Sequence, residues 1–498
     1  FNVGDQITYV HVLNGLDVTQ PISYKFRVGA RSSGFSTFTF DEHGQRLTSV
    51  GLAGTDFGTY DNKLSSATVT AQLLPGFTDG RSQLKFSFTS TSSSSNGYID
   101  WYEVFYWRYL QAQNNQFNFH TYDTSGVTRY DVSGFTNSQV LVFDVTRYDS
   151  VLQIINPRVS GDTCSFQLTS GSVREMYVVA DGGFKTPSTL SRVANQNLYG
   201  DTTQASFIII THPDFMSAAQ RLKNHREQPD ENYLTTLVVD INKIYNEFGG
   251  GLLSPAAIRN YLRYVNDHWQ IPPKYVLLFG DGHHDYKNIA TATTNWIPPW
   301  ETQESFRPLS SYAVDDDYVI FNSGNRVGVG LGRLTARSLS EANAMVDKII
   351  EYETNPVIDP WKVRLTYVAD DGLAGAGERN NLFIHTNDAE LISQLAPALF
   401  EKRKIYLYDY PTIYTSAGRR KPDVNTAIVN QLNQGTVVLN FNGHGNPRVW
   451  THEQVFVRET DFANLSNKGK YFFLIAATCN YSHFDMLNDQ SGGEILVS

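Results

Sequence analysis

Cysteine is scarce in this sequence. Only Cys164 and Cys479 occur among 498 residues, which excludes the disulfide framework typical of small secreted domains. A disulfide between the two would leave neither thiol free for chemistry. Low cysteine content occurs in proteins of reducing and of oxidising compartments, so it does not reveal where this protein works.

Long apolar runs and excess positive charge are also missing. No apolar stretch approaches the roughly 18 residues of a membrane span. The formal net charge is −10 and no basic patch offsets it, which argues against a nucleic-acid partner. The sequence that begins at Phe1 does not have the pattern of a signal peptide. The sequence starts within a strand-like stretch and stops at a helix-like start, so we expect an internal piece of a longer polypeptide, in which absent targeting signals decide nothing.

The length of 498 residues suggests about three domains. Residues 1–175 contain short, alternating, aromatic-rich segments separated by Gly, Asn, Asp and Ser clusters, a pattern typical of all-β sandwiches. Residues 176–204 are predicted to connect this β-rich region to the rest. The β-rich region itself shows no motif that predicts chemistry.

From Ala205 onward, apolar strands alternate with amphipathic helices, which predicts parallel sheets covered by helices. Ser254-Pro255 and the Ser338/Glu341 pair supply helix starts. The pattern pauses around 355–360 and then begins again. We therefore predict two α/β subdomains, residues 205–360 (subdomain A) and residues 361–498 (subdomain B).

Two strand ends in subdomain B carry the residues of greatest chemical interest. VVLNF (437–441) is followed by Asn-Gly-His-Gly with His444, and FFLIAA (472–477) is followed by Thr478 and Cys479. Chemistry in open α/β sheets collects beyond the carboxyl ends of such strands. A thiol requires a base to become a nucleophile, and imidazole titrates in the appropriate range. A buried cysteine and a turn histidine are the alternatives for each residue alone, but together they predict a catalytic dyad.

These blocks resemble the caspase-like cysteine peptidases, and specifically the gingipains. The resemblance extends upstream through YVLLFGDG (275–282), VGVGLGRLTARSLSEANAMVDKIIEYE (327–353) and VRLTYVADDG (363–372). MYVVADGGFKTP (176–187), ASFIIITHPDF (205–215) and the ATCNYSHFD form around the cysteine are most similar to the sortase branch of the family, which serves type IX secretion. Thr478 stands where many relatives of the caspase type have alanine. The resemblance implies a caspase/gingipain-like fold in which subdomain B carries the dyad.

Further site residues follow partly from the resemblance and partly from the chemistry. The resemblance places an acid that orients the histidine in FIHTNDAE (383–390), where Asp388 is the candidate and Glu390 lies behind it; exposed carboxylates of a first helical turn are an equal alternative. Backbone N–H groups of Gly445 and Cys479 are candidates for an oxyanion hole. His452 and His483 are polar neighbours of the dyad.

No cofactor or catalytic metal is required by this chemistry. GDGHHD (280–285) invites a metal interpretation, but Asp281 is better explained as shaping a loop at the subdomain edge. Asp315-Asp316-Asp317 offers oxygen ligands for a structural calcium ion, although a solvated turn is the favoured explanation.

The predicted function is acyl transfer, in which Cys479 attacks a peptide carbonyl and His444 moves the protons. The resemblance implies a sortase that removes the C-terminal signal domain of secreted cargo and joins the cargo to an amine on surface lipopolysaccharide. It also implies a PorV-like outer-membrane partner and a location on the extracellular face of the outer membrane. A gingipain-type endopeptidase, and a non-enzymatic surface module with a vestigial dyad, remain the alternatives.

Overall fold

The computed structural model describes residues 1–55, 63–122, 125–201, 204–322, 324, 326–354, 359–373 and 381–498. The chain divides into two compact units. Unit 1 comprises Phe1–Ala194 and Glu304–Ser311, and unit 2 comprises Asn195–Gln303 and Tyr312–Ser498. Within the described ranges, no helix has the length and apolar character needed to cross a membrane.

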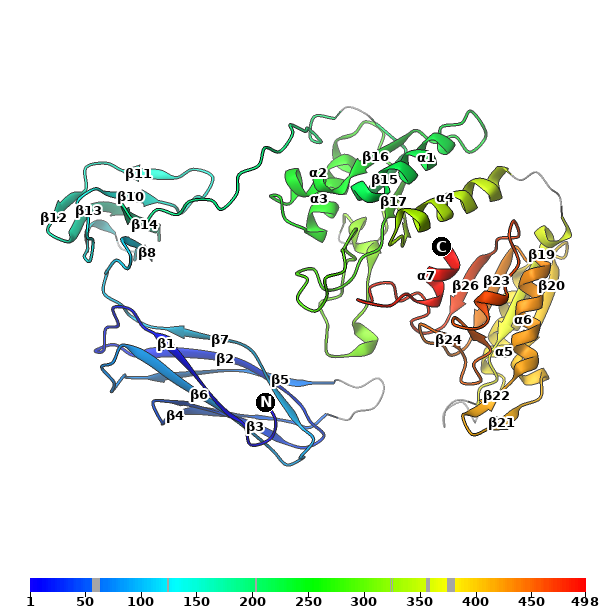
Figure 1. Ribbon diagram of the computed structural model, residues 1–498, viewed down its shortest axis with the longest axis horizontal. Coiled ribbons are helices and arrows are strands. Elements are labelled where there is room, and N and C mark those ends of the chain that lie inside the picture. The colour runs from blue at the N-terminus through cyan, green and yellow to red at the C-terminus, as the bar shows by residue number, and fades with distance from the viewer. Residues whose placement is uncertain are drawn as a thin grey trace. The chain divides into compact units, whose positions relative to one another are not determined.

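Unit 1 begins with an antiparallel sandwich (blue in Figure 1). One sheet has the strand order β1-β6-β3-β4 and the other β5-β2-β7. Alternate residues of these strands point inward, and a stacked phenylalanine pair, Phe26 and Phe40, lies in the core with ring centroids 4.1 Å apart. The strands are β1 Gln6–Val12, β2 Ile22–Arg31, β3 Ser36–Glu42, β4 Gln45–Leu52, β5 Ser65–Leu73, β6 Arg81–Ser90 and β7 Asn96–Phe105.

A second antiparallel module completes unit 1 (cyan in Figure 1). Its sheets have the orders β11-β10-β14-β8 and β12-β13-β9. The core between them includes Phe117, Val142 and Cys164. The 3-10 helix η2 (Pro308–Ser310) also belongs to unit 1. The strands are β8 Gln116–His120, β9 Gly126–Val132, β10 Val140–Asp144, β11 Leu152–Ile154, β12 Arg158–Ser160, β13 Thr163–Ser170 and β14 Glu175–Ala180.

Subdomain A of unit 2 is a four-stranded parallel sheet of order β16-β15-β17-β18. Helices α2 and α3 cover one face, packing on Ile208 and Leu278, and α1 and α4 cover the other, packing on Ile209 and Phe279. The elements are β15 Phe207–Thr211, η1 Pro213–Phe215, α1 Met216–Arg226, β16 Thr236–Asp240, α2 Ile241–Phe248, α3 Pro255–His268, β17 Tyr275–Phe279, η3 Asp315–Tyr318, β18 Gly330–Leu334 and α4 Leu339–Thr354.

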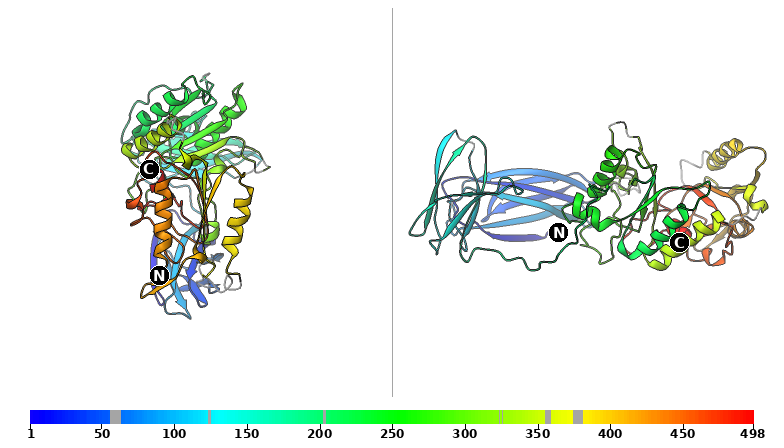
Figure 2. Two further views of the ribbon diagram at one scale, coloured as in Figure 1. Left: turned by 90° about the vertical axis from the view of Figure 1, so that its right-hand side faces the viewer. Right: turned by 90° about the horizontal axis from the view of Figure 1, so that it is seen from above.

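Subdomain B is a second parallel sheet, of order β20-β19-β23-β26. Helix α6 packs on Leu439 and Phe441 of one face, and α5 packs on Tyr367 and Ala369 of the other; the left view of Figure 2 shows these helices, in orange and gold, on opposite sides of the strands. The elements are η4 Pro360–Val363, β19 Arg364–Ala369, α5 Ile384–Leu395, β20 Glu401–Tyr406, η6 Leu407–Asp409, β21 Ile413–Thr415, β22 Gly418–Arg420, α6 Pro422–Gln434, β23 Val438–Asn442, β24 Val449–Trp450, β25 Phe456–Val457, η7 Phe462–Asn464, β26 Phe473–Ala477 and α7 Gly492–Val497.

The predicted fold class is confirmed: two parallel-sheet subdomains follow an all-β, sandwich-like region. Strand β14 pairs with β10 and β8, so β structure continues past residue 175 to Ala180. The division between the compact units falls at Ala194, within the predicted connecting segment 176–204. Residues 355–358, which contain most of the predicted junction between the subdomains, lie outside the described residues.

Candidate active site

His444 and Cys479 follow the ends of two adjacent strands. β23 and β26 pair in parallel, with Asn442 opposite Ala477, and His444 and Cys479 each come two positions later. Because parallel strands in register end at the same edge of a sheet, both residues lie at the carboxyl edge of subdomain B. Cys479 is exposed and His444 is half-buried, so the thiol is accessible to a substrate.

The loop that carries His444 (443–448, the histidine loop) and the loop that carries Cys479 (478–491, the cysteine loop) are in direct contact. A Cβ atom on Gly445 would lie 2.5 Å from the Thr478 Oγ1, so a larger residue there would force the Thr478 side chain to shift. The histidine loop is also anchored to its own sheet, because Trp450 stacks on Phe441 with ring centroids 4.1 Å apart. The Gly445 and Cys479 N–H groups therefore belong to adjoining loops, and the oxyanion hole remains a prediction.

A buried carboxylate holds the histidine loop. Asp370 directly follows β19, the strand beside β23, and its Oδ2 accepts a hydrogen bond of 3.0 Å from the His444 N–H. Burial raises the pKa of Asp370, against the hydrogen bonds it accepts from the His444 and Asp371 N–H groups. Asp388, the predicted orienting acid, is exposed on α5, and its role remains a prediction. Glu390 accepts hydrogen bonds from Lys404 and Tyr406.

Asp370 was not singled out from the sequence, although a signal was present. VRLTYVA is an apolar strand and Asp370-Asp371 follows it, in the same position relative to the strand as the residues that predicted the dyad. The missing information was the strand order, which places β19 beside β23.

Further buried acids lie next to Asp370, and basic side chains neutralise them. Ligand oxygens of Asp370, Asp371 and Glu453 lie within 4.8 Å of one another. The Arg419 guanidinium is 2.9 Å from Glu453, and the Lys421 ammonium is 3.5 Å from Asp371. Burial, together with Asp371 and Asp370, raises the pKa of Glu453. Asp371 and Glu453, the acids beside Asp370, are therefore each paired with a basic side chain.

Three more histidines lie near the dyad. The ring centroids of His385 and His452 are 5.3 and 5.4 Å from that of His444, both nearly perpendicular to it. His385 Nδ1 is 3.3 Å from the Asn442 Oδ1. His483 instead pairs with Asp485 at 2.9 Å, and this partner raises the pKa of His483.

The loop after Cys479 rests on subdomain A, at the GDGHHD segment. The His284 Nδ1 lies 3.0 Å from the Asp485 carbonyl oxygen, and Arg333 stacks on Phe484. Asp281 is paired with Arg337, as expected for a loop-shaping residue at the subdomain edge. His283 contacts the Thr293 carbonyl oxygen, so the polar residues of the segment bind separate partners rather than converging on one ion.

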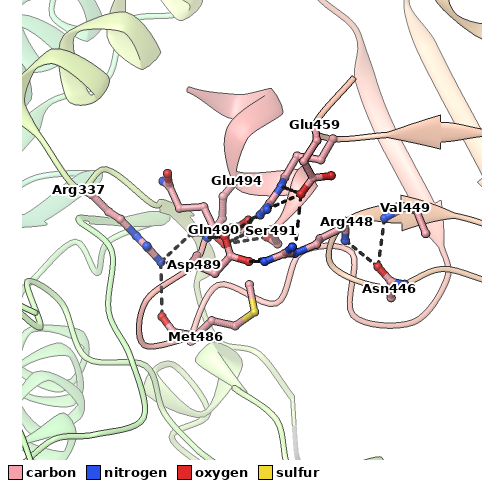
Figure 3. Close-up of polar contacts among 11 residues, drawn as sticks. Arg337, Asn446, Arg448, Val449, Glu459, Met486, Asp489, Gln490, Ser491 and Glu494 are labelled. Carbon is pink, nitrogen blue, oxygen red and sulfur yellow. Dashed lines mark hydrogen bonds and ion pairs between the residues drawn. The ribbon is translucent and has the colours of Figure 1, made fainter. Parts of the chain in front are cut away.

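Asp489 joins the histidine loop, the cysteine loop and subdomain A. Figure 3 shows Arg448, from the histidine loop, against the Asp489 carboxylate, at 2.6 Å. Arg458 binds the same carboxylate at 2.8 Å, and Arg337 of subdomain A donates to the Asp489 carbonyl oxygen at 2.6 Å. Partial burial raises the pKa of Asp489, but hydrogen bonds from Arg458, Arg448 and the Gln490 N–H outweigh it and lower the pKa to about 2. We call Arg337, Arg448, Arg458 and Asp489 the Asp489 bridge.

The remaining predicted features are placed as follows. Asp315, of the proposed calcium site, accepts two hydrogen bonds from Arg333, of 2.6 and 3.0 Å, so its charge already has a partner; calcium remains a prediction. Cys164 is fully buried in the second β module, where burial raises the pKa of its thiol to about 11. Its thiol is therefore a packing group.

The fold and site can be compared with known proteins. The profile of peptidase family C25 matches residues 201–498. The structure is similar to dimeric latent PorU from Porphyromonas gingivalis, with a TM-score of 0.59 and 20% identity over 71% of this chain and 36% of the PorU chain. The chain thus spans little more than a third of PorU.

Gingipain R (RgpB) is a further relative among solved structures. It gives a TM-score of 0.42 and 18% identity over 61% of this chain and 60% of its own. The RgpB complex of pro- and mature domains, from Porphyromonas gingivalis, gives the same TM-score and identity over 58% and 59%. No curated protein matches the sequence. Since the profile covers more than half of the chain, including His444 and Cys479, the chain belongs to peptidase family C25, the gingipain family of cysteine peptidases.

Proposed function

We propose that this chain is the catalytic part of a gingipain-type sortase at the cell surface. It would remove the C-terminal signal domain of secreted cargo and join the cargo to an amine on lipopolysaccharide. The observation that carries the acyl-transfer chemistry is the placement of His444 and an exposed Cys479 beyond adjacent parallel strands, with Asp370 behind the histidine. The likeness to PorU supports the sortase outcome over simple hydrolysis.

The proposed reaction has two halves. His444 accepts the proton of the Cys479 thiol, and Sγ attacks the peptide carbonyl carbon. The C–N bond breaks, His444 returns the proton to the leaving amine, and a thioester remains on Cys479. An acceptor amine then attacks the thioester and loses a proton to His444. A new amide bond forms, and the Cys479 thiolate is released.

The remaining residues act on this sequence indirectly. Asp370 accepts a hydrogen bond from the backbone N–H of His444 and so holds the loop that carries the imidazole. The N–H groups of Gly445 and Cys479 would stabilise the oxyanion of each tetrahedral intermediate. A PorV-like outer-membrane partner, and a location on the extracellular face, belong to the same proposal.

The experiment supplies cargo, purified lipopolysaccharide and the partner proteins, and counts conjugated against hydrolysed cargo by mass spectrometry. Water is in large molar excess, so an amine at millimolar concentration succeeds only if the site positions it. Conjugate that saturates with acceptor and disappears in Cys479→Ala supports the sortase. Hydrolysed product alone, at saturating acceptor, moves the assignment to a gingipain-type endopeptidase.

A non-enzymatic surface module is the third candidate, and one measurement separates it from both enzymes. A cargo C-terminal region is incubated with the protein, and Cys479 is analysed for a thioester. Failure to detect a thioester under any condition, together with unreacted cargo, would favour the module.

A further inference from the structure

Three side chains from separate segments converge beside the nucleophile. Asp370 follows β19, His385 lies in the first turn of α5, and His444 follows β23. One ligand atom from each residue lies within 4.8 Å of those of the other two. The convergence arises because α5 packs through Ala389 on Tyr367 and Ala369 of β19, which places its first turn above the carboxyl edge of the sheet.

Two of the three side chains, those of His385 and Asp370, are oriented by neighbouring residues. The His385 Nδ1 is 3.3 Å from the Asn442 Oδ1, a partner of the kind that fixes the ring orientation of metal-binding histidines. The carboxylate of Asp370 accepts the Asp371 N–H at 2.8 Å and the His444 N–H at 3.0 Å. Each carboxylate oxygen has a further lone pair, so these bonds leave coordination open.

The donor set selects a class of cation. Two imidazoles and one carboxylate are the three-ligand combination found at catalytic zinc sites, whereas calcium and magnesium prefer oxygen ligands. A tetrahedral zinc ion with bonds of about 2.0–2.1 Å has ligand atoms roughly 3.3 Å apart. The ligand atoms now lie up to 4.8 Å apart. Side-chain rotations that bring them about 1.5 Å closer together would therefore reach the spacing of a zinc site.

We propose that Asp370, His385 and His444 bind zinc, or a similar borderline divalent cation, and that this ion inhibits the enzyme reversibly. A zinc–nitrogen bond uses the imidazole lone pair that would otherwise accept the Cys479 proton. Zinc and the catalytic proton therefore compete for His444, and a chelator restores activity. The metal is an inhibitor at this site and takes no part in the reaction.

The binding test uses the Cys479→Ala protein, so that the thiol cannot supply a ligand. Metal-free protein is titrated with Co²⁺ and with Zn²⁺, and binding is followed by the visible absorption of tetrahedral Co²⁺ and by calorimetry. We expect one ion per chain. His385→Ala in this background should weaken binding by at least tenfold. His385→Gln provides a second variant if the alanine protein does not fold.

His452→Ala is the matched control. The His452 ring lies about as close to the His444 ring as the His385 ring does, but His452 is not a member of the three-residue cluster. It should leave the affinity for Co²⁺ and Zn²⁺ unchanged. In the protein with Cys479 intact, zinc inhibition, measured relative to each variant's own metal-free activity, should be weaker in His385→Gln than in His452→Ala.

Two results would overturn the proposal. One is unchanged metal affinity in a folded His385 variant. The other is loss of all binding in Cys479→Ala, which would assign the ion to the thiolate and His444 alone. Because the Co²⁺ titration does not require turnover, either result can be told apart from failure of the proposed sortase activity.

Discussion

At the scale of single residues, the two cysteines differ in their environment. Cys479 is exposed at a strand end, whereas burial raises the pKa of the Cys164 thiol to about 11. We therefore expect iodoacetamide at pH 8 to alkylate Cys479 in the folded protein and to reach Cys164 only after unfolding. Peptide mapping of the alkylated protein checks this.

Cys479→Ala should abolish turnover, whereas a folded Cys164→Ala protein should retain it. The reverse pattern would contradict the assignment of Cys479 as the nucleophile.

Substitution of Asp370 and substitution of Asp388, the two candidate acids, should affect turnover differently. Asp370 is buried and binds the His444 backbone, while Asp388 is exposed on α5. We expect Asp370→Asn to lower kcat by roughly 10- to 100-fold, because a loosened loop would misplace the imidazole by about 1 Å. Asp388→Asn should change kcat by less than about threefold. Turnover by both folded variants is compared with that of His444→Ala; a greater loss in Asp388→Asn would restore Asp388 as the orienting acid.

The same residues show how far the sequence leads. Cys479 and His444 could be predicted because each follows an apolar strand and the pair has a chemical mechanism. Asp370 also follows a strand, but its role depends on β19 lying beside β23, and strand order is a property of the folded sheet. Asp388 was favoured from family resemblance alone, which could not reveal that its side chain is exposed.

At the scale of elements, the Asp489 bridge fixes one loop against another. Asp489→Asn would remove the charge that Arg448 and Arg458 share, so the histidine and cysteine loops should separate slightly. A displacement of about 1 Å can cost roughly 10²-fold in rate. We expect kcat to fall by about 10- to 100-fold, with a smaller change in KM, measured by steady-state kinetics.

Asp149→Asn is the control for this experiment. Asp149 also pairs with an arginine, Arg147 at 3.1 Å, but both are exposed in unit 1. Exposed pairs of this kind contribute little to stability. Equal losses of kcat in the two variants would show that the Asp489 bridge has no positioning role.

The elements themselves were predicted better than their connections. Strands and helices of both subdomains follow from apolar periodicity. The contact between the cysteine loop and GDGHHD (280–285) could not be predicted from periodicity, because it joins His284 to Asp485 across about 200 residues of sequence. The adjacent histidines invited a metal interpretation, whereas each contacts a backbone carbonyl oxygen, His283 that of nearby Thr293 and His284 that of distant Asp485.

At the scale of the whole molecule, a buried carboxyl group of subdomain A, that of Glu301, faces a carboxylate of subdomain B. Glu301, next to Asp485, has its pKa raised to about 8, chiefly by burial and then by the charge of Asp485. An unfolded glutamate titrates near 4.3, so between about pH 4.3 and 8 the folded state binds more protons than the unfolded state. Stability should therefore fall as pH rises through this window, by at most about 1.4 kcal/mol per pH unit from this group.

Glu301→Gln tests this raised pKa. The amide can still donate a hydrogen bond to Asp485 but does not titrate, so urea unfolding of the variant should depend less steeply on pH between 5 and 8. Parallel curves for the wild type and the variant would show that Glu301 ionises normally in the folded protein.

Because the loop after Cys479 rests on subdomain A, opening of the subdomain interface and misplacement of the nucleophile are a single event. Local opening in proteins occurs at lower free energy than global unfolding. Amide hydrogen exchange in the residues that follow Cys479 would therefore report the opening of this interface in native conditions. A small molecule bound between His284 and Asp485 would be expected to displace the cysteine loop without contacting Cys479 itself.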